Sequence, residues 1–153
     1  MLEQLRVIVQ EVNAAKDLQS ALDIIVHRVR ESLKTQVCSV YLLDSDLNSH
    51  VLMASEGLRK ESVGHVSLEV GEGLVGLVAK HAEPINLRDA SLHPSFHYLQ
   101  ETGEEDFHAF LGVPIIHHRS VLGVLVVQHE EKRRFDEGEE AFLITLSAQL
   151  AGV

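Results

Sequence analysis

The chain has 153 residues, of which 45% are hydrophobic and 24% are charged. This composition is typical of one globular domain, and it excludes collagen-like and intrinsically disordered classes. The formal net charge at pH 7 is −10, so the long-range field repels phosphate backbones and anionic membrane surfaces. We therefore expect neither nucleic acid nor a membrane as a partner.

Cysteine usage and the N-terminal sequence indicate the cellular compartment of the protein. Cys38 is the single cysteine and lies in the apolar run VCSVYLL, where we expect a small core residue rather than a disulfide. The opening stretch MLEQLRVIVQEV has no basic region followed by a continuous apolar one, and no later run approaches the ~20 apolar residues of a membrane span. These features predict a cytoplasmic protein.

The first half of the chain predicts two helices and then three strands. Apolar residues recur at helical spacing over 5–12 and 18–33, and Asp17 is placed to cap the second helix. The segments 36–44 and 50–57 predict two strands joined by a polar turn, and HVSLEV at 65–70 predicts a third. A short helix is expected over 74–82, followed by a strand at PINL, residues 84–87.

The second half predicts a hairpin and a final helix. The apolar segments 109–116 and 121–128 flank the polar stretch HHRS, which is typical of a hairpin whose strands are buried on both faces. The last helix, within 135–153, begins with Asp136 and Glu139 in the capping-box spacing. Strands in consecutive hairpins with helices at the two ends indicate an α+β fold with an antiparallel sheet.

The segment Gly71 to Gly76 matches the dinucleotide-binding pattern G-x-G-x-x-G. A Rossmann unit requires a buried apolar strand before the glycines and parallel strands after them, whereas HVSLEV is polar and 109–128 is a hairpin. We expect the first two glycines to allow a tight entry into a helix instead. The unpaired N–H groups at such a helix start attract a small anion.

Histidines are numerous, but their spacing does not predict a metal site. His93 and His97 are four residues apart, yet Pro94 lies between them and no cysteine or acid is near. The chain also lacks a nucleophile-elbow sequence, an H-E-x-x-H motif and a P-loop lysine. We therefore expect no catalytic residue, no metal and no cofactor in this domain.

The order of the motifs resembles a GAF domain, the small-molecule sensor module of many signalling proteins. The segments VCSVYLLD, EGLVGLVAKHAEPINLRDASLHPSF and AFLGVPIIHHRSVLGVLVVQ, closed by a helix, carry this resemblance. QVCSVYL, EGLVGLVA, AEPINL, HPSF and FLGVPII are similar to the N-terminal GAF domains of nitrogen-branch phosphoenolpyruvate-protein phosphotransferases, enzyme I of the nitrogen phosphotransferase system.

The resemblance covers essentially the whole chain and implies one GAF domain over 1–153, as the N-terminal fragment of a longer phosphotransferase. It implies a central antiparallel sheet of about six strands, with the N- and C-terminal helices packed on one face. The ligand pocket is expected on the other face, under residues 71–99. The resemblance places the phosphorylated histidine of such enzymes in later domains of the parent chain.

The function that the resemblance implies is sensing of a nitrogen-status metabolite, glutamine or 2-oxoglutarate, with the signal passed to the catalytic domains of the same parent chain. The alternative is a dimerisation module whose pocket is vestigial. Polar residues on the covering loop favour the sensor. The expected ligand-binding residues are Gly73, Leu74, Val75, Arg88, Asp89, Phe96, Tyr98 and Phe110.

Two further expectations concern the ligand and the partner. A ligand carboxylate is expected to be held by the N–H groups at the start of the 74–82 helix or by the guanidinium of Arg88, while Phe96 and Tyr98 close over the aliphatic part. A homodimer is expected through apolar stripes on the terminal helices. These stripes comprise Leu5, Ile8, Val12, Phe142, Leu146 and Leu150.

Overall fold

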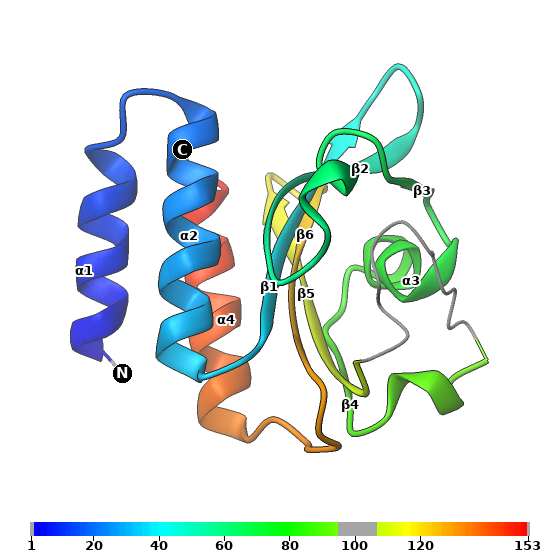
Figure 1. The fold of residues 1–153 in the computed structure, drawn as a ribbon. Coiled ribbons are helices and arrows are strands. Elements are labelled where there is room, and N and C mark those ends of the chain that lie inside the picture. The colour runs from blue at the N-terminus through cyan, green and yellow to red at the C-terminus, as the bar shows by residue number, and fades with distance from the viewer. Residues whose placement is uncertain (1, 95–106, 153) are drawn as a thin grey trace.

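The computed structural model describes residues 2–94 and 107–152 (Figure 1). In these two ranges, four α-helices, two short 3₁₀ helices and six strands follow one another. In order they are α1 (Leu2–Asn13), α2 (Leu18–Leu33), β1 (Val37–Asp44), β2 (Ser49–Glu56), η1 (Lys60–Ser62), β3 (Ser67–Glu69), α3 (Gly73–His81), β4 (Ile85–Leu87), η2 (Ala90–Leu92), β5 (Ala109–His117), β6 (Ser120–His129) and α4 (Glu137–Leu150).

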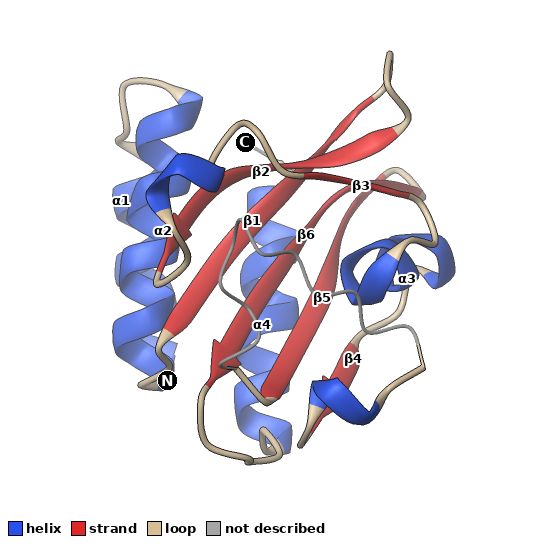
Figure 2. Cartoon of the chain, turned by 45° about the vertical axis from the view of Figure 1, so that its right-hand side comes forward, coloured by secondary structure: helices blue, strands red, loops and turns tan. Residues whose placement is uncertain are grey.

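The six strands form one sheet in the order β3-β2-β1-β6-β5-β4, and every neighbouring pair is antiparallel (Figure 2). The strand before the glycine-rich segment, β3, pairs with β2, and the strand after it, β4, pairs with β5. The two strands that flank the glycines therefore lie at opposite edges of the sheet. This arrangement confirms the α+β prediction and excludes a parallel βαβ unit around the glycines.

The sheet separates two hydrophobic clusters. Helices α1, α2 and α4 lie on one face, with α1 outermost, and α3 lies on the other face (Figure 1). The cluster on the face of α1, α2 and α4 contains Ile25 and Val29 of α2, Leu143 and Leu146 of α4, and Leu125 of β6. The predicted packing of the terminal helices on one face is confirmed.

The apolar stripes of the terminal helices belong to this cluster. Ile8, Val12, Phe142 and Leu146 are buried in it, and Leu5 and Leu150 pack against it. Ile8, Val12, Phe142 and Leu146 are therefore used in the core of this chain, whereas Leu5 and Leu150 stay partly exposed. Homodimerisation itself stays a prediction.

The helix caps that the sequence indicates are present. The carboxylate of Asp17 accepts a hydrogen bond from Ser20 N at 2.8 Å and so caps α2. At the start of α4, Asp136 accepts from Glu139 N at 2.8 Å, and the Glu139 carboxylate accepts from Asp136 N at 2.9 Å. Both helices begin within two residues of the predicted start, because each cap is specified by neighbouring residues alone.

A β-bulge in β2 decides which side chains reach the α3 face. In the β1–β2 pair, Val40 lies opposite Ala54, while the next residue, Tyr41, lies opposite Leu52. Met53 is therefore the extra residue. A bulge of this kind reverses the alternation of the strand. Leu52 accordingly packs in the cluster under α3, whereas Ala54, two residues later, packs in the cluster under α1, α2 and α4.

Candidate functional site

The face of the sheet under α3, which we call the α3 face, is the one on which a ligand pocket was expected (Figure 2). Buried apolar side chains from β1, β2, β3, β5, β6 and α3 meet here. They include Val37, Tyr41, Leu52, Leu68, Leu74, Val75, Val78, Phe110, Val124 and Val126. The face is therefore largely apolar, and its few polar groups are candidates for ligand recognition.

The strand register identifies those polar groups, since residues directly opposite each other in an antiparallel pair share a face. Ser39 lies opposite Ser55 and Val126, and Gln128 lies opposite Phe110 and Val37. Among the described strand residues, the polar set on the α3 face comprises Ser39, Tyr41, His50, Ser55 and Gln128. None of them carries a charge at neutral pH in its ordinary protonation state.

Sequence reasoning missed these residues because VCSVYLL reads as one continuous apolar run. A period of two along that run separates Val37, Ser39 and Tyr41 from Cys38 and Val40, and this was the available signal. The structure confirms the split, since the first group faces α3 and the second packs under α1, α2 and α4.

Ser39 and Ser55 form a hydroxyl pair on this face. Their Oγ atoms are 2.9 Å apart, and Ser39 is fully buried while Ser55 is partly exposed. A hydroxyl has one hydrogen to donate, so within the pair one hydrogen bonds the partner oxygen and the other remains available. The pair is therefore able to offer one donor and several lone pairs to a ligand.

The glycine-rich segment forms the tight strand-to-helix turn that its residues indicate. Gly71 and Gly73 have φ angles of +89° and +67°, which side-chain-bearing residues rarely adopt. Gly71 N donates to Gly76 O at 2.8 Å. A Cβ atom on Gly76 would lie 2.5 Å from Glu69 O, so the third glycine is required because α3 approaches the end of β3 so closely.

The first turn of α3 leaves backbone donors unused. The residue before the helix, Glu72, caps none of them, because its carboxylate accepts from Glu69 N at 3.0 Å. Within the described part of the chain, the N–H groups of Gly73, Leu74 and Val75 have no hydrogen-bond acceptor. Such N–H groups at a helix start favour a negatively charged oxygen.

Arg88 and Asp89, the charged candidates, differ in their surroundings. Arg88 follows β4, is exposed, and makes no ion pair with a described residue. The Asp89 side chain is only 9% exposed. Its Oδ1 accepts from Ser91 N at 3.1 Å, from Ser91 Oγ at 2.6 Å and, in the tautomer with a proton on Nδ1, from His108 Nδ1 at 3.0 Å.

The second oxygen of Asp89, Oδ2, is 3.6 Å from Lys132 Nζ. Hydrogen bonds from Ser91 and His108 lower the pKa of Asp89 to about 2. The backbone N–H of Ala90 also donates to His108 O at 2.6 Å. Asp89 therefore ties the segment after β4 to the start of β5, and its carboxylate is already engaged by groups of this chain.

The remaining candidates are apolar or lie outside the described residues. Leu74, Val75 and Phe110 are buried in the cluster on the α3 face, and Gly73 opens α3 beside them. Phe96 and Tyr98 lie outside the described residues. The structure thus brings Gly73, Leu74, Val75 and Phe110 to one face.

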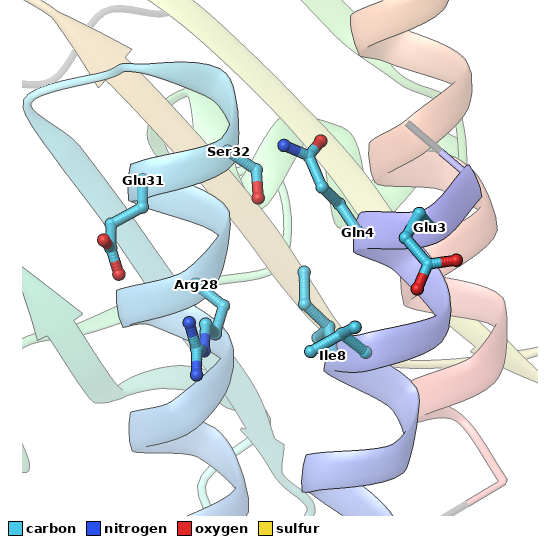
Figure 3. A pocket seen from close by; sticks show the side chains of 7 residues that line it. Glu3, Gln4, Ile8, Arg28, Glu31 and Ser32 are labelled. Atoms are coloured by element: carbon cyan, nitrogen blue, oxygen red, sulfur yellow. The ribbon is translucent and has the colours of Figure 1, made fainter.

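A separate cleft of about 290 Å³ lies between α1 and α2 (Figure 3). Arg28 of α2 lines it, but two of its three guanidinium nitrogens, Nε and Nη2, donate to the Glu11 carboxylate, at 3.0 and 2.6 Å, and this contact raises the Arg28 pKa. Glu3, from α1, is paired with Arg6. Since these charges already have partners, we assign the cleft no ligand.

Metal and thiol chemistry find little support in the described residues. Over 2–94 and 107–152, no group of three or more His, Cys, Asp or Glu side chains is arranged to hold a metal ion. Cys38 is fully buried under α2, and burial raises the pKa of its thiol. Among the described helices, none is long and apolar enough to cross a membrane.

Comparison with known proteins agrees with the fold. The family model described as GAF domain matches residues 17–153. The chain belongs to the GAF domain family. This GAF domain is 52% identical over all 153 residues to an Escherichia coli K12 protein named phosphoenolpyruvate-dependent phosphotransferase system, of whose length it spans 20%.

A solved structure, the GAF domain from a phosphoenolpyruvate-protein phosphotransferase (ptsP) of Coxiella burnetii, superposes with a TM-score of 0.94 at 49% identity, covering 99% of this chain and 90% of that one. The nitrogen fixation protein VnfA of Azotobacter vinelandii is 29% identical over 143 residues, which is 87% of this chain and 27% of VnfA. The chain thus spans about a fifth of the phosphotransferase-system relative and about a quarter of VnfA.

Proposed function

We propose that this GAF domain is the regulatory sensor of a phosphoenolpyruvate-protein phosphotransferase, and that it binds glutamine or 2-oxoglutarate and passes its occupancy to the catalytic domains of the same parent chain. The support is the identity of 52% along the whole chain to a phosphotransferase-system protein. A relative named for nitrogen fixation supports a nitrogen-status ligand. We place the parent protein in the cytoplasm.

The observation that carries the ligand class is the uncharged polar set on the α3 face. None of the described strand residues on this face is Lys or Arg. Burying an anionic group without donors costs several kcal/mol. Among the described residues, the N–H groups of Gly73, Leu74 and Val75 are free backbone donors beside the face, and they suit a single carboxylate.

Charge therefore favours glutamine over 2-oxoglutarate. Glutamine has no net charge, because its one carboxylate is balanced by the neighbouring α-ammonium group, and its side-chain amide needs neutral donors and acceptors such as Ser39 Oγ and Ser55 Oγ. 2-Oxoglutarate has two carboxylates, and the second would enter a face without a cation. Each unit charge that is left unpaired weakens binding by several-fold or more.

Calorimetric titration of this chain with each metabolite tests the proposal. We expect glutamine to bind at least about tenfold more tightly than 2-oxoglutarate. Ser39→Ala should weaken glutamine binding by about three- to tenfold, the loss of one hydrogen bond. The matched control is Ser67→Ala, since Ser67 is an exposed serine of β3. Tighter binding of 2-oxoglutarate would overturn the charge argument.

A dimerisation module without a ligand remains the competing function. The burial of Tyr41 and Phe110 favours it, because these two rings fill much of the α3 face from within. It predicts no heat with either metabolite, together with a dimer in sedimentation experiments. Absence of binding by the unaltered chain would therefore decide for this second function.

A further inference from the structure

His50 is a buried histidine of the α3 face, and the functions proposed above give it no contact of its own. It is the second residue of β2, and 1% of its surface is exposed. Directly opposite it lie Leu43 on β1 and Leu68 on β3. Because the alternation of β2 places it with Leu52, the imidazole lies on the α3 face, between the central strand β1 and the edge strand β3.

Within the described residues, the imidazole has no hydrogen-bond partner. Nδ1 and Nε2 are both buried, and neither forms a hydrogen bond with another described group. A buried polar group without a partner costs about 1–3 kcal/mol, and a buried charge costs more. His50 is therefore held in its neutral form at an energetic cost, in a position where an apolar side chain would pack without that cost.

Along the described strands β1, β2 and β3, no charged side chain shares the face of the imidazole. On β1, Tyr41 is the titratable group on the same face, and Asp44 lies on the opposite face. On β3, Ser67 and Glu69 alternate away from Leu68 and are exposed. On β2 itself, Ser49 and Val51 alternate away. The lowered pKa of His50 is therefore caused by burial and not by a charged neighbour.

We propose that His50 is a pH-sensitive latch, which holds the edge strand β3 on the sheet while the imidazole is neutral and releases β3 when the imidazole is protonated. A protonated imidazole requires contact with water. Water can reach His50 if β3 moves aside, because β3 is the edge strand next to β2. Three residue pairs join β3 to β2. Two further backbone hydrogen bonds join the segment before β3 to Leu52, from Leu52 N to Val66 O at 2.9 Å and from Gly64 N to Leu52 O at 2.7 Å.

The release of β3 would directly affect the α3 face, where the ligand is proposed to bind. Glu69, the last residue of β3, accepts from Glu72 N at 2.9 Å and lies against Gly76 of α3. Movement of β3 therefore disturbs the first turn of α3, with its free N–H groups. The latch exists whether or not the domain binds glutamine, so its test needs no ligand.

The size of the effect follows from proton linkage. In the released state His50 regains an ordinary pKa of about 6.5. Because its pKa is lower in the closed state, protons favour release, and the closed state is fully stable only above about pH 6.5. Between pH 7.5 and pH 5.5 the opening equilibrium of β3 should rise, by about tenfold at most.

Hydrogen–deuterium exchange of the β3 amides tests the latch, after correction for the intrinsic pH dependence of exchange. We expect the same rise in opening at low pH for the unaltered chain and for His65→Leu, since His65 is exposed and nearby. We expect no rise for His50→Leu, whose side chain cannot be protonated. Equal pH dependence in His50→Leu and in the unaltered chain would overturn the proposal, as would loss of the rise in His65→Leu.

A second measurement keeps the proposal testable if His50→Leu does not fold. Titration of the imidazole resonances of the unaltered chain should give His50 a midpoint clearly below the ordinary histidine value of about 6.5. The β3 amides should shift with the same midpoint as His50. A His50 midpoint at the ordinary value, or β3 amides that do not shift at the His50 midpoint, would show that His50 is not a latch.

Discussion

The hydroxyl pair on the α3 face gives a prediction in which the more exposed serine matters more. Ser39 is fully buried and Ser55 Oγ is its hydrogen-bond partner, at 2.9 Å. Ser55→Ala leaves the buried Ser39 hydroxyl without that partner and without water, which should destabilise the fold by about 1–3 kcal/mol. Ser39→Ala leaves Ser55, which water can reach, and should cost about 0.5–1.5 kcal/mol.

The double variant completes the test. Replacing both partners of a buried hydrogen bond is close to neutral, so Ser39→Ala with Ser55→Ala should cost no more than Ser55→Ala alone, and the coupling between the two changes should be about 1 kcal/mol. Urea unfolding followed by circular dichroism measures these free-energy differences. In thermal unfolding, each kcal/mol should shift the Tm by about 2–4 °C. Exposed Ser67→Ala is the control. If Ser39→Ala cost more than Ser55→Ala, or if the two changes added, the pair would not be an isolated hydrogen bond.

Three further predictions follow from charged and reactive groups. Arg88→Ala should change glutamine affinity by less than about threefold because Arg88 is exposed, whereas a loss of about 30- to 1000-fold in calorimetry would show that its guanidinium holds the carboxylate. The pKa of Asp89 is lowered from 3.8 to about 2 in the folded state, so its carboxylate stabilises the fold above about pH 4 and the stabilisation is lost as the pH falls towards 2. Acid unfolding of Asp89→Asn should therefore show less pH dependence in that range, and an unchanged profile would contradict this. The buried Cys38 thiol should resist a thiol reagent at pH 8 in the native state and react fully in urea; rapid reaction of native protein would disprove the burial argument.

The parts of the fold that local chemistry specifies could be predicted from the sequence. Asp17 and the pair Asp136 and Glu139 mark helix starts because a cap requires only residues three positions apart. The β5–β6 hairpin was clear because HHRS interrupts two apolar segments, and His118 and Arg119 adopt the positive φ angles of its turn, 49° and 68°. Strand ends differed by one or two residues, as at β3, expected over 65–70 and observed at Ser67–Glu69.

The faces of the strands could not be predicted, and this limited the site. Phe110 and Leu111 are both buried and apolar, yet they pack in different clusters, and nothing in the sequence distinguishes them. The helical stripes were equally ambiguous, since periodicity shows that Ile8 and Leu146 need an apolar neighbour without showing whether it belongs to the same chain. The polar residues of the α3 face were hidden because identifying them requires the strand register.

The extra residue at Met53 restricts how the gene for this domain can change length. Deletion of one codon within β2 would remove the bulge and exchange the faces to which residues 49–52 point. His50 would then lie on the face of α1, α2 and α4, and Val51 would take its place on the α3 face beside β3. Loss of two codons would preserve the orientation but shorten the strand. Among related genes, we expect single-codon insertions and deletions to be confined to the turn between β1 and β2, and length changes within β2 to be rare.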